Sequence, residues 1–108
     1  MSFSFKDNTN DVLFGLDTAI DRALARIGFQ AEGYAKDLCP VDTGRLRGSI
    51  TNEVASEEKA VYIGTNVEYA PYVELGTSRQ RAQPYLKPAA ANHRRTYENI
   101  LKDELKNG

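Results

Sequence analysis

The sequence is poor in the residues that build metal centres and disulfide frameworks. Its 108 residues include one cysteine, one histidine, one methionine and no tryptophan. A single cysteine forms no intramolecular disulfide, which excludes a disulfide scaffold and fits a reducing compartment. One histidine and one cysteine also provide no recognisable cluster of zinc ligands. We therefore expect no metal centre.

Long apolar runs are also missing. No stretch approaches the ~20 residues that span a membrane, and the first residues lack the apolar segment of a signal peptide. Eight glycines and four prolines exclude a collagen or a low-complexity chain, while 41% hydrophobic and 27% charged residues are typical of a globular protein. The expectation is a single domain over residues 1–108, made in the cytoplasm, with no membrane partner.

A strong charge of one sign is absent overall, because the net charge of −1 excludes a polybasic nucleic-acid protein. The charge is nevertheless unevenly placed. Five basic and no acidic side chains lie in residues 77–95, namely Arg79, Arg81, Lys87, Arg94 and Arg95. This is either a chance imbalance on a solvated surface or a contact with an acidic surface. The acidic surface would be a neighbouring subunit or the phosphate backbone of DNA.

The longest predicted element is an N-terminal helix. Apolar residues recur at steps of three and four, which predicts a helix over Asp11–Leu38 that Pro40 ends. Phe29 lies on the opposite side of this helix from the apolar stripe. It is either a singly exposed aromatic or a contact with another subunit. Gly15 and Gly33 fall on the same side and either allow a second chain to approach or kink the helix.

Two short alternating segments predict an antiparallel hairpin. Residues 50–54 and 60–65 read as strands, and residues 56–59 form the polar connection between them. A short helical turn is expected within residues 66–76.

The remaining segments leave alternatives open. Residues 77–84 are polar and basic and predict either a mobile loop or an edge strand. A last helix starts at Pro84, or near Lys87, and extends to about Leu105. Residues 1–7 form either a local strand or an N-terminal arm onto a neighbour. The predicted fold is α+β, with the long N-terminal helix and the C-terminal helix packed on a small antiparallel sheet of two to four strands.

The side chains available for catalysis are few. His93 falls on the apolar stripe of the last helix, which favours a packing role over proton transfer. Cys39 lies at a helix C-terminus, so it lacks the helix N-terminus that lowers the pKa of a thiol. The carboxylates have no diagnostic spacing, and the glycines form no phosphate-binding loop. We therefore expect no enzymatic activity.

Three motifs occur in a characteristic order: PVDTGRLRGSI at residues 40–50, YAPYVELGT at residues 69–77 and QPYLKPA at residues 83–89. With the preceding long helix, they resemble the HK97 gp10-like family of tailed-bacteriophage neck or tail-completion proteins. The resemblance extends over about residues 8–105.

The resemblance implies a non-enzymatic virion protein without a cofactor, which joins head to tail and is made in the cytoplasm of the bacterial host. It implies a homo-oligomeric ring of six-fold or twelve-fold symmetry around the DNA channel. Other neck and tail proteins are the expected partners, with non-specific contact to channel DNA. The alternative is a small nucleic-acid-binding module that acts through residues 77–95.

The resemblance also assigns roles to residues. Structural roles are expected for the motif residues Asp42, Thr43, Gly44, Leu46, Tyr69, Tyr72, Glu74, Gly76, Thr77 and Pro84. Contact with a partner or with channel DNA is expected at Arg79, Arg81, Lys87, Arg94, Arg95 and Phe29.

Overall fold

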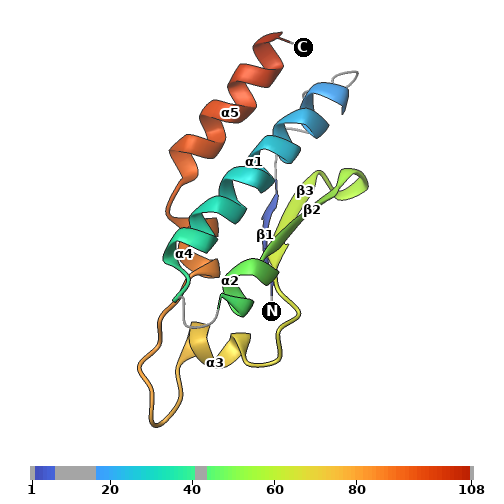
Figure 1. Ribbon diagram of the computed structural model, residues 1–108. Coiled ribbons are helices and arrows are strands. Elements are labelled where there is room, and N and C mark those ends of the chain that lie inside the picture. Colours follow the sequence, from blue (N-terminus) through green and yellow to red (C-terminus); the bar gives the residue numbers. More distant parts are fainter. Residues whose placement is uncertain (1, 7–16, 41–43, 108) are drawn as a thin grey trace.

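The computed structural model describes residues 2–6, 17–40 and 44–107 of an elongated molecule that measures 50 × 22 × 21 Å (Figure 1). Its elements in chain order are β1 (Ser2–Lys6), α1 (Asp17–Leu38), α2 (Arg45–Ser49), β2 (Thr51–Ala55), the 3-10 turn η1 (Ser56–Glu58), β3 (Ala60–Gly64), α3 (Ala70–Leu75), α4 (Leu86–Ala91) and α5 (Arg94–Asn107). The fold is α+β, as the sequence predicts.

The sheet has three antiparallel strands in the order β1-β3-β2. The predicted hairpin is confirmed as β2 and β3, with Val54 opposite Val61. Residues 2–6 supply the third strand and pair along the other edge of β3. Because β3 is central, Val61 and Ile63 are fully buried, as expected for apolar residues in a strand covered by helices.

Helix α1 packs against β2 and β3 through its apolar stripe. The buried stripe comprises Ile20, Leu24, Ile27, Ala31 and Ala35, at steps of three and four. The apolar spacing of the sequence predicts that the stripe continues to Leu38, which is wrong, because Leu38 is 47% exposed. Residues 11–16, where the helix was expected to begin, lie outside the described residues, as does Gly15.

Gly28 lies on the side of α1 that faces β2 and β3. A Cβ at this position would lie 2.6 Å from Asn52 Oδ1 and 2.9 Å from Val61 Cγ2. A side chain at this position requires the Asn52 and Val61 side chains to shift, so glycine is what lets α1 pack this closely on them.

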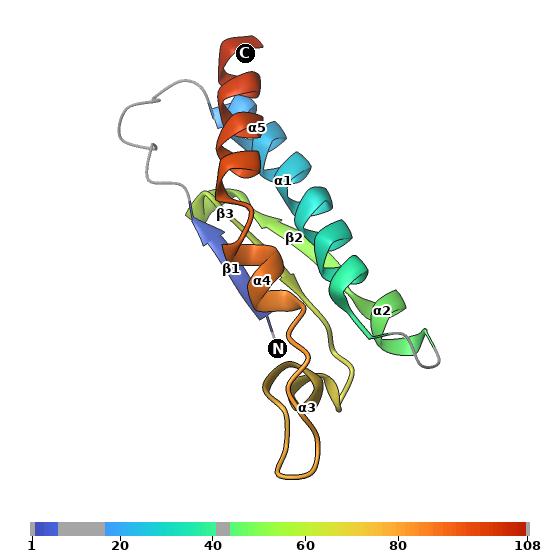
Figure 2. The ribbon, with the colours of Figure 1, turned by 90° about the vertical axis from the view of Figure 1, so that its left-hand side faces the viewer.

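The prediction of one continuous C-terminal helix is wrong, because α4 ends at Ala91 and α5 begins at Arg94. His93 at the break stacks on Tyr34 of α1, with ring centroids 3.6 Å apart. The break lets α5 run beside α1, as both ribbon views show (Figure 2).

Ion pairs hold α5 against α1. Arg22 bridges Glu104 at 3.1 Å, and Arg26 bridges both Asp103 and Glu104 at 2.9 Å. Hydrogen bonds from Arg22 and then Arg26 lower the pKa of the Glu104 carboxyl.

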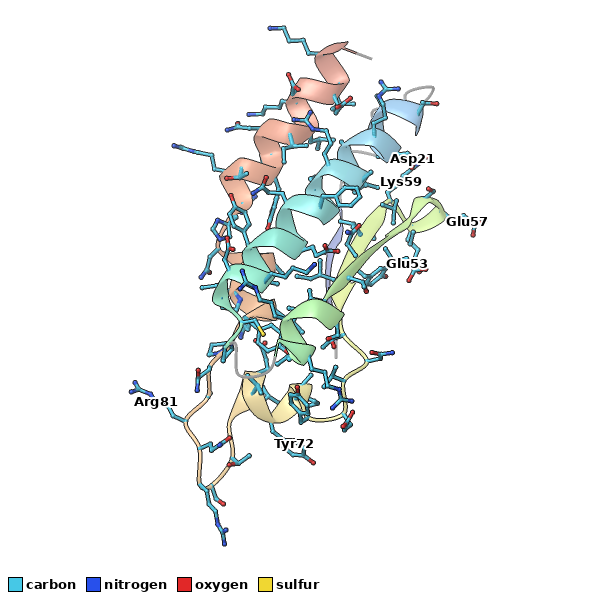
Figure 3. The ribbon with its side chains drawn as sticks, viewed as in Figure 1. Asp21, Glu53, Glu57, Lys59, Tyr72 and Arg81 are labelled. Atoms are coloured by element: carbon cyan, nitrogen blue, oxygen red, sulfur yellow. The ribbon has the colours of Figure 1, made fainter. Side chains whose placement is uncertain are left out.

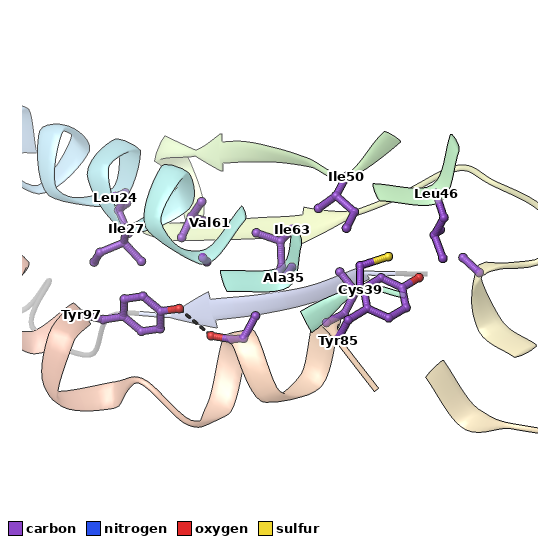
Figure 4. Packing of buried hydrophobic residues seen from close by; sticks show 14 of the residues in the cluster. Leu24, Ile27, Ala35, Cys39, Leu46, Ile50, Val61, Ile63, Tyr85 and Tyr97 are labelled. Carbon is purple, nitrogen blue, oxygen red and sulfur yellow. Dashed lines mark hydrogen bonds between the residues drawn. The ribbon is translucent and has the colours of Figure 1, made fainter. Parts of the chain in front are cut away.

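The core runs along the junction of α1, the sheet and α4 (Figure 4). Tyr85 and Leu86 are fully buried at the start of α4. The Tyr97 hydroxyl donates a hydrogen bond to the backbone oxygen of Ala89, which ties α5 to α4. Burial raises the pKa of the Tyr97 phenol, so the hydroxyl stays protonated and keeps this bond.

Candidate functional site

The loop between α3 and α4, residues 76–85, contains no strand, so the edge-strand alternative is wrong. Its base is closed where the Gln83 N–H donates to the backbone oxygen of Val73 at 2.8 Å. Gly76 adopts φ of +79°, and a Cβ there would lie 2.7 Å from the backbone nitrogen of Ala82. Only glycine allows the loop to fold back at this point.

Thr77 organises the far part of the same loop. Its N–H donates to the backbone oxygen of Gln80 at 2.9 Å. Its side-chain oxygen accepts hydrogen bonds from the N–H groups of Arg79 at 3.2 Å and Gln80 at 3.0 Å. Threonine stabilises turns in this way, so the loop has a defined shape.

Glu74 fixes the end of the loop to the start of α4. Its side chain is 3% exposed. Oε1 accepts the N–H groups of Tyr85 at 3.0 Å and Leu86 at 2.9 Å, and Oε2 accepts the N–H of Lys87 at 3.1 Å. A carboxylate at this point satisfies amides at a helix start that would otherwise lack acceptors.

The five basic residues of segment 77–95 are all exposed, but the fold distributes them over three elements. Arg79 and Arg81 lie in the 76–85 loop, Lys87 on α4, and Arg94 and Arg95 on the first turn of α5. Arg94 pairs with Glu98 at 2.7 Å. The other four form no ion pair with any residue that the structure describes.

Exposed apolar side chains border this loop. On α3, Tyr72 is 60% and Leu75 is 70% exposed. The resemblance assigned Tyr72 a structural role as a motif residue, and its exposure excludes a place in the core. Phe29 is 69% exposed on another surface, where it lines a shallow hollow between α1 and α5. The fold therefore does not bring Phe29 together with the 76–85 loop.

Acidic side chains gather elsewhere, on β2 and η1. Glu53, Glu57 and Glu58 are exposed there. Figure 3 shows Glu53 and Glu57 on the opposite side of the molecule from Arg81. Glu58 accepts a hydrogen bond from the Tyr62 hydroxyl, whereas Glu53 and Glu57 form no ion pair with another described residue.

The first family motif forms the turn into α2. Asp42 and Thr43 lie outside the described residues. Gly44 precedes the helix with φ of +81°, and Leu46 is buried. The side chain of Arg45, next to this glycine, binds both carboxylate oxygens of Glu68 at 3.0 and 2.9 Å.

The second motif connects to the first through Arg45. Its guanidinium lies 5.4 Å from the ring centroid of the half-buried Tyr69. The hydrogen bonds from Arg45 lower the pKa of the Glu68 carboxyl. Pro84 of the third motif is exposed and precedes α4 by two residues.

Reactive side chains are placed for packing. Cys39 is buried at the end of α1, and burial raises the pKa of its thiol, which disfavours the nucleophilic thiolate. His93 stacks face to face on Tyr34. Within the described part of the chain, no group of three or more histidine, cysteine, aspartate or glutamate side chains is placed to hold a metal ion. No helix described there is long and apolar enough to cross a bilayer.

Comparison with known families matches residues 4–76 to the model "Bacteriophage HK97-gp10, putative tail-component". The chain belongs to the HK97-gp10-like family. The HK97-gp10-like match runs from within β1 to the end of α3 and stops just before the basic segment, so the third motif lies outside it. Searches of curated proteins and of solved structures found no match. Family membership makes the chain a phage structural protein of the tail-component class, with a place in the virion.

The sequence missed several parts of this surface. Leu75 and Glu53 were not candidates, because only the fold shows their exposure. The Arg45–Glu68 pair joins residues that are 23 positions apart, so no local spacing indicated it. One sequence feature pointed to the role of Glu74. The first backbone N–H groups of α4 need acceptors, and neither Pro84 nor Tyr85, which precede the helix, has a side chain that caps them, so the acceptor comes from elsewhere in the chain.

Proposed function

We propose that this chain is a structural protein of the phage head–tail junction, where copies form a ring around the DNA channel. Membership of the HK97-gp10-like family of tail components carries the proposal. The protein acts as one domain, by binding rather than by catalysis, and uses no cofactor. It is made in the host cytoplasm, and its partners are further copies of itself and other neck and tail proteins.

The distribution of charge supports a ring. A ring needs a contact between two unlike surfaces of adjacent copies, since a contact between like surfaces closes as a dimer. This chain carries exposed arginines in the 76–85 loop and exposed carboxylates on β2 and η1. Ring symmetry of six or twelve copies would match the symmetry expected of a tail or a portal.

The proposal is tested by inactivating the gene in the phage and imaging the lysate. DNA-filled heads and separate tails, with joined particles restored by the wild-type gene, are the expected result. Normal yields of joined infectious particles in the absence of the protein would contradict the head–tail role.

A second candidate is non-specific DNA binding through residues 77–95. Four cations there, Arg79, Arg81, Lys87 and Arg95, make no ion pair with described residues and so remain available to phosphates. A gel shift with duplex DNA distinguishes the two candidates. A few phosphate contacts are lost steeply with salt, so a shift that survives ~200 mM salt favours the DNA-binding module.

A further inference from the structure

The end of the molecule formed by α3 and the 76–85 loop, here called the loop end, combines apolar and cationic side chains. Tyr72 and Leu75 are exposed on α3, and Arg79 and Arg81 are exposed in the loop that follows. Aromatic residues and arginine are enriched in protein interfaces and in their energetically dominant positions. A phosphate-binding surface needs cations and polar groups, and an exposed leucine adds nothing to it. The composition of the loop end therefore favours a protein partner over DNA.

The loop end is also preorganised. Gly76 folds the loop back, Thr77 orders its far part and Glu74 fixes it to α4. A loop that already has its bound shape loses little conformational entropy on association. This geometry suits insertion of Arg79 and Arg81 into a complementary surface.

A complementary surface exists on the same chain. Glu53 and Glu57 are exposed on β2 and η1, lie away from Arg81, and pair with none of the described residues (Figure 3). Lys59 is the only basic residue of the β2–β3 connection, so this surface, here called the acidic edge, stays negative.

We propose that the loop end of one copy binds the acidic edge of a second copy, with Arg79 and Arg81 facing Glu53 and Glu57. This inference rests on the proposed ring and names the surfaces that build it. The contact is heterologous, so each copy uses its loop end for one neighbour and its acidic edge for the other. The copies close into a ring when the rotation between adjacent copies divides a full turn evenly. Exposed ion pairs are individually weak, so the contact is salt-sensitive and depends on several copies acting together.

Charge reversal tests the pairing. We expect Arg79→Glu/Arg81→Glu and Glu53→Arg/Glu57→Arg each to weaken self-association at least tenfold in sedimentation at low salt. The chain carrying all four changes should recover to within about threefold of wild type, because reversed charges again face each other. The matched control Lys102→Glu/Lys106→Glu makes the same charge change at exposed positions on α5, outside the loop end, and should leave association unchanged.

Several outcomes would overturn the pairing. They are an absence of rescue in the four-fold variant, an equal loss in the control, or no self-association of the wild type. Far-UV circular dichroism verifies that each variant is folded, which is expected because all four side chains are exposed.

Cysteine cross-linking gives a second measurement in a Cys39→Ser background. Under oxidation, a mixture of the Arg81→Cys and Glu57→Cys chains should form a covalent dimer, whereas either chain alone should not. Arg81→Cys mixed with Asn92→Cys, at an exposed site on neither surface, is the control. No dimer in the first mixture, or the same yield in the control mixture, overturns the proposal.

Virion assembly distinguishes a failure of the pairing from a failure of the head–tail role. If the Arg79→Glu/Arg81→Glu chain enters virions and joins heads to tails as wild type does, the pairing is wrong and the head–tail role stands. If the wild-type chain is missing from virions, the head–tail role itself is wrong.

Discussion

Replacing Glu74 should destabilise the protein more than any exposed acidic substitution. The side chain is buried and accepts three backbone N–H groups, from Tyr85, Leu86 and Lys87. A buried donor left without an acceptor costs about 1–3 kcal/mol, and water reaches the half-buried end of this cluster. We therefore expect Glu74→Ala to lower the free energy of unfolding by about 3–4 kcal/mol.

The conservative variant should lose less. Glu74→Gln keeps one oxygen that accepts the N–H groups of Tyr85 and Leu86, but its amide nitrogen would face the Lys87 N–H, and two donors repel. A loss of about 1–2 kcal/mol follows. Since small domains are stable by about 5–15 kcal/mol, both losses are measurable.

Urea unfolding followed by far-UV circular dichroism at pH 7 measures these changes. Glu57→Ala, an exposed residue on η1, is the matched control and should stay within about 0.5 kcal/mol of wild type. Hydrogen exchange of the Tyr85, Leu86 and Lys87 amides gives a local readout and should speed up in both Glu74 variants. A Glu74→Ala loss below ~1 kcal/mol, or one equal to that of Glu57→Ala, would refute the role of Glu74 as the anchor of the loop.

Two further predictions concern the packing of α1. Gly33→Ala should stabilise the protein by about 0.5–1 kcal/mol, because the added Cβ would have no atom within 4 Å beyond the local helix backbone. Gly28→Ala should destabilise the protein by about 1–3 kcal/mol, because the added Cβ would lie 2.6 Å from Asn52 Oδ1. Equal shifts of the thermal unfolding midpoint in the two variants would contradict this reasoning. Stability should also fall as the pH drops below about 5. Hydrogen bonds from Arg22 and Arg26 lower the pKa of the Glu104 carboxyl in the folded state. Below about pH 5 the unfolded chain therefore binds more protons at Glu104 than the folded protein does, which favours unfolding. Glu104→Gln should make this fall shallower, and a slope parallel to wild type in urea titrations at pH 3–6 would refute the assignment.

Elements with a local periodic signal could be predicted from the sequence. The stripe of α1 and the alternation of β2 and β3 report burial directly, because helix and strand repeat at different intervals along the chain. The concentration of basic residues in segment 77–95 was also visible, since charge is counted without a fold.

Features set by distant contacts could not be predicted. The apolar spacing continues across Asn92 and His93, so nothing local marked the break between α4 and α5; the stacking of His93 on Tyr34 accompanies it. Glu74 lies 11 positions before Tyr85, and its carboxylate reads as a solvated charge until α3 and α4 are brought together.

In the candidate site, too, the local sequence pattern was predictable and the contacts formed by folding were not. The sequence placed Arg79 and Arg81 in a basic segment, but their preorganised loop depends on Gly76 meeting Ala82, a contact formed only by the folded loop. Leu75 gains its significance from exposure beside those arginines, which composition does not report.

Labelling of the protein in purified virions tests the central claim most directly. Antibody against the chain, detected by gold in electron micrographs, should mark the junction between head and tail in intact particles. Label confined to the capsid shell or the distal tail, or the absence of the chain from purified particles, would contradict the assignment to the head–tail junction.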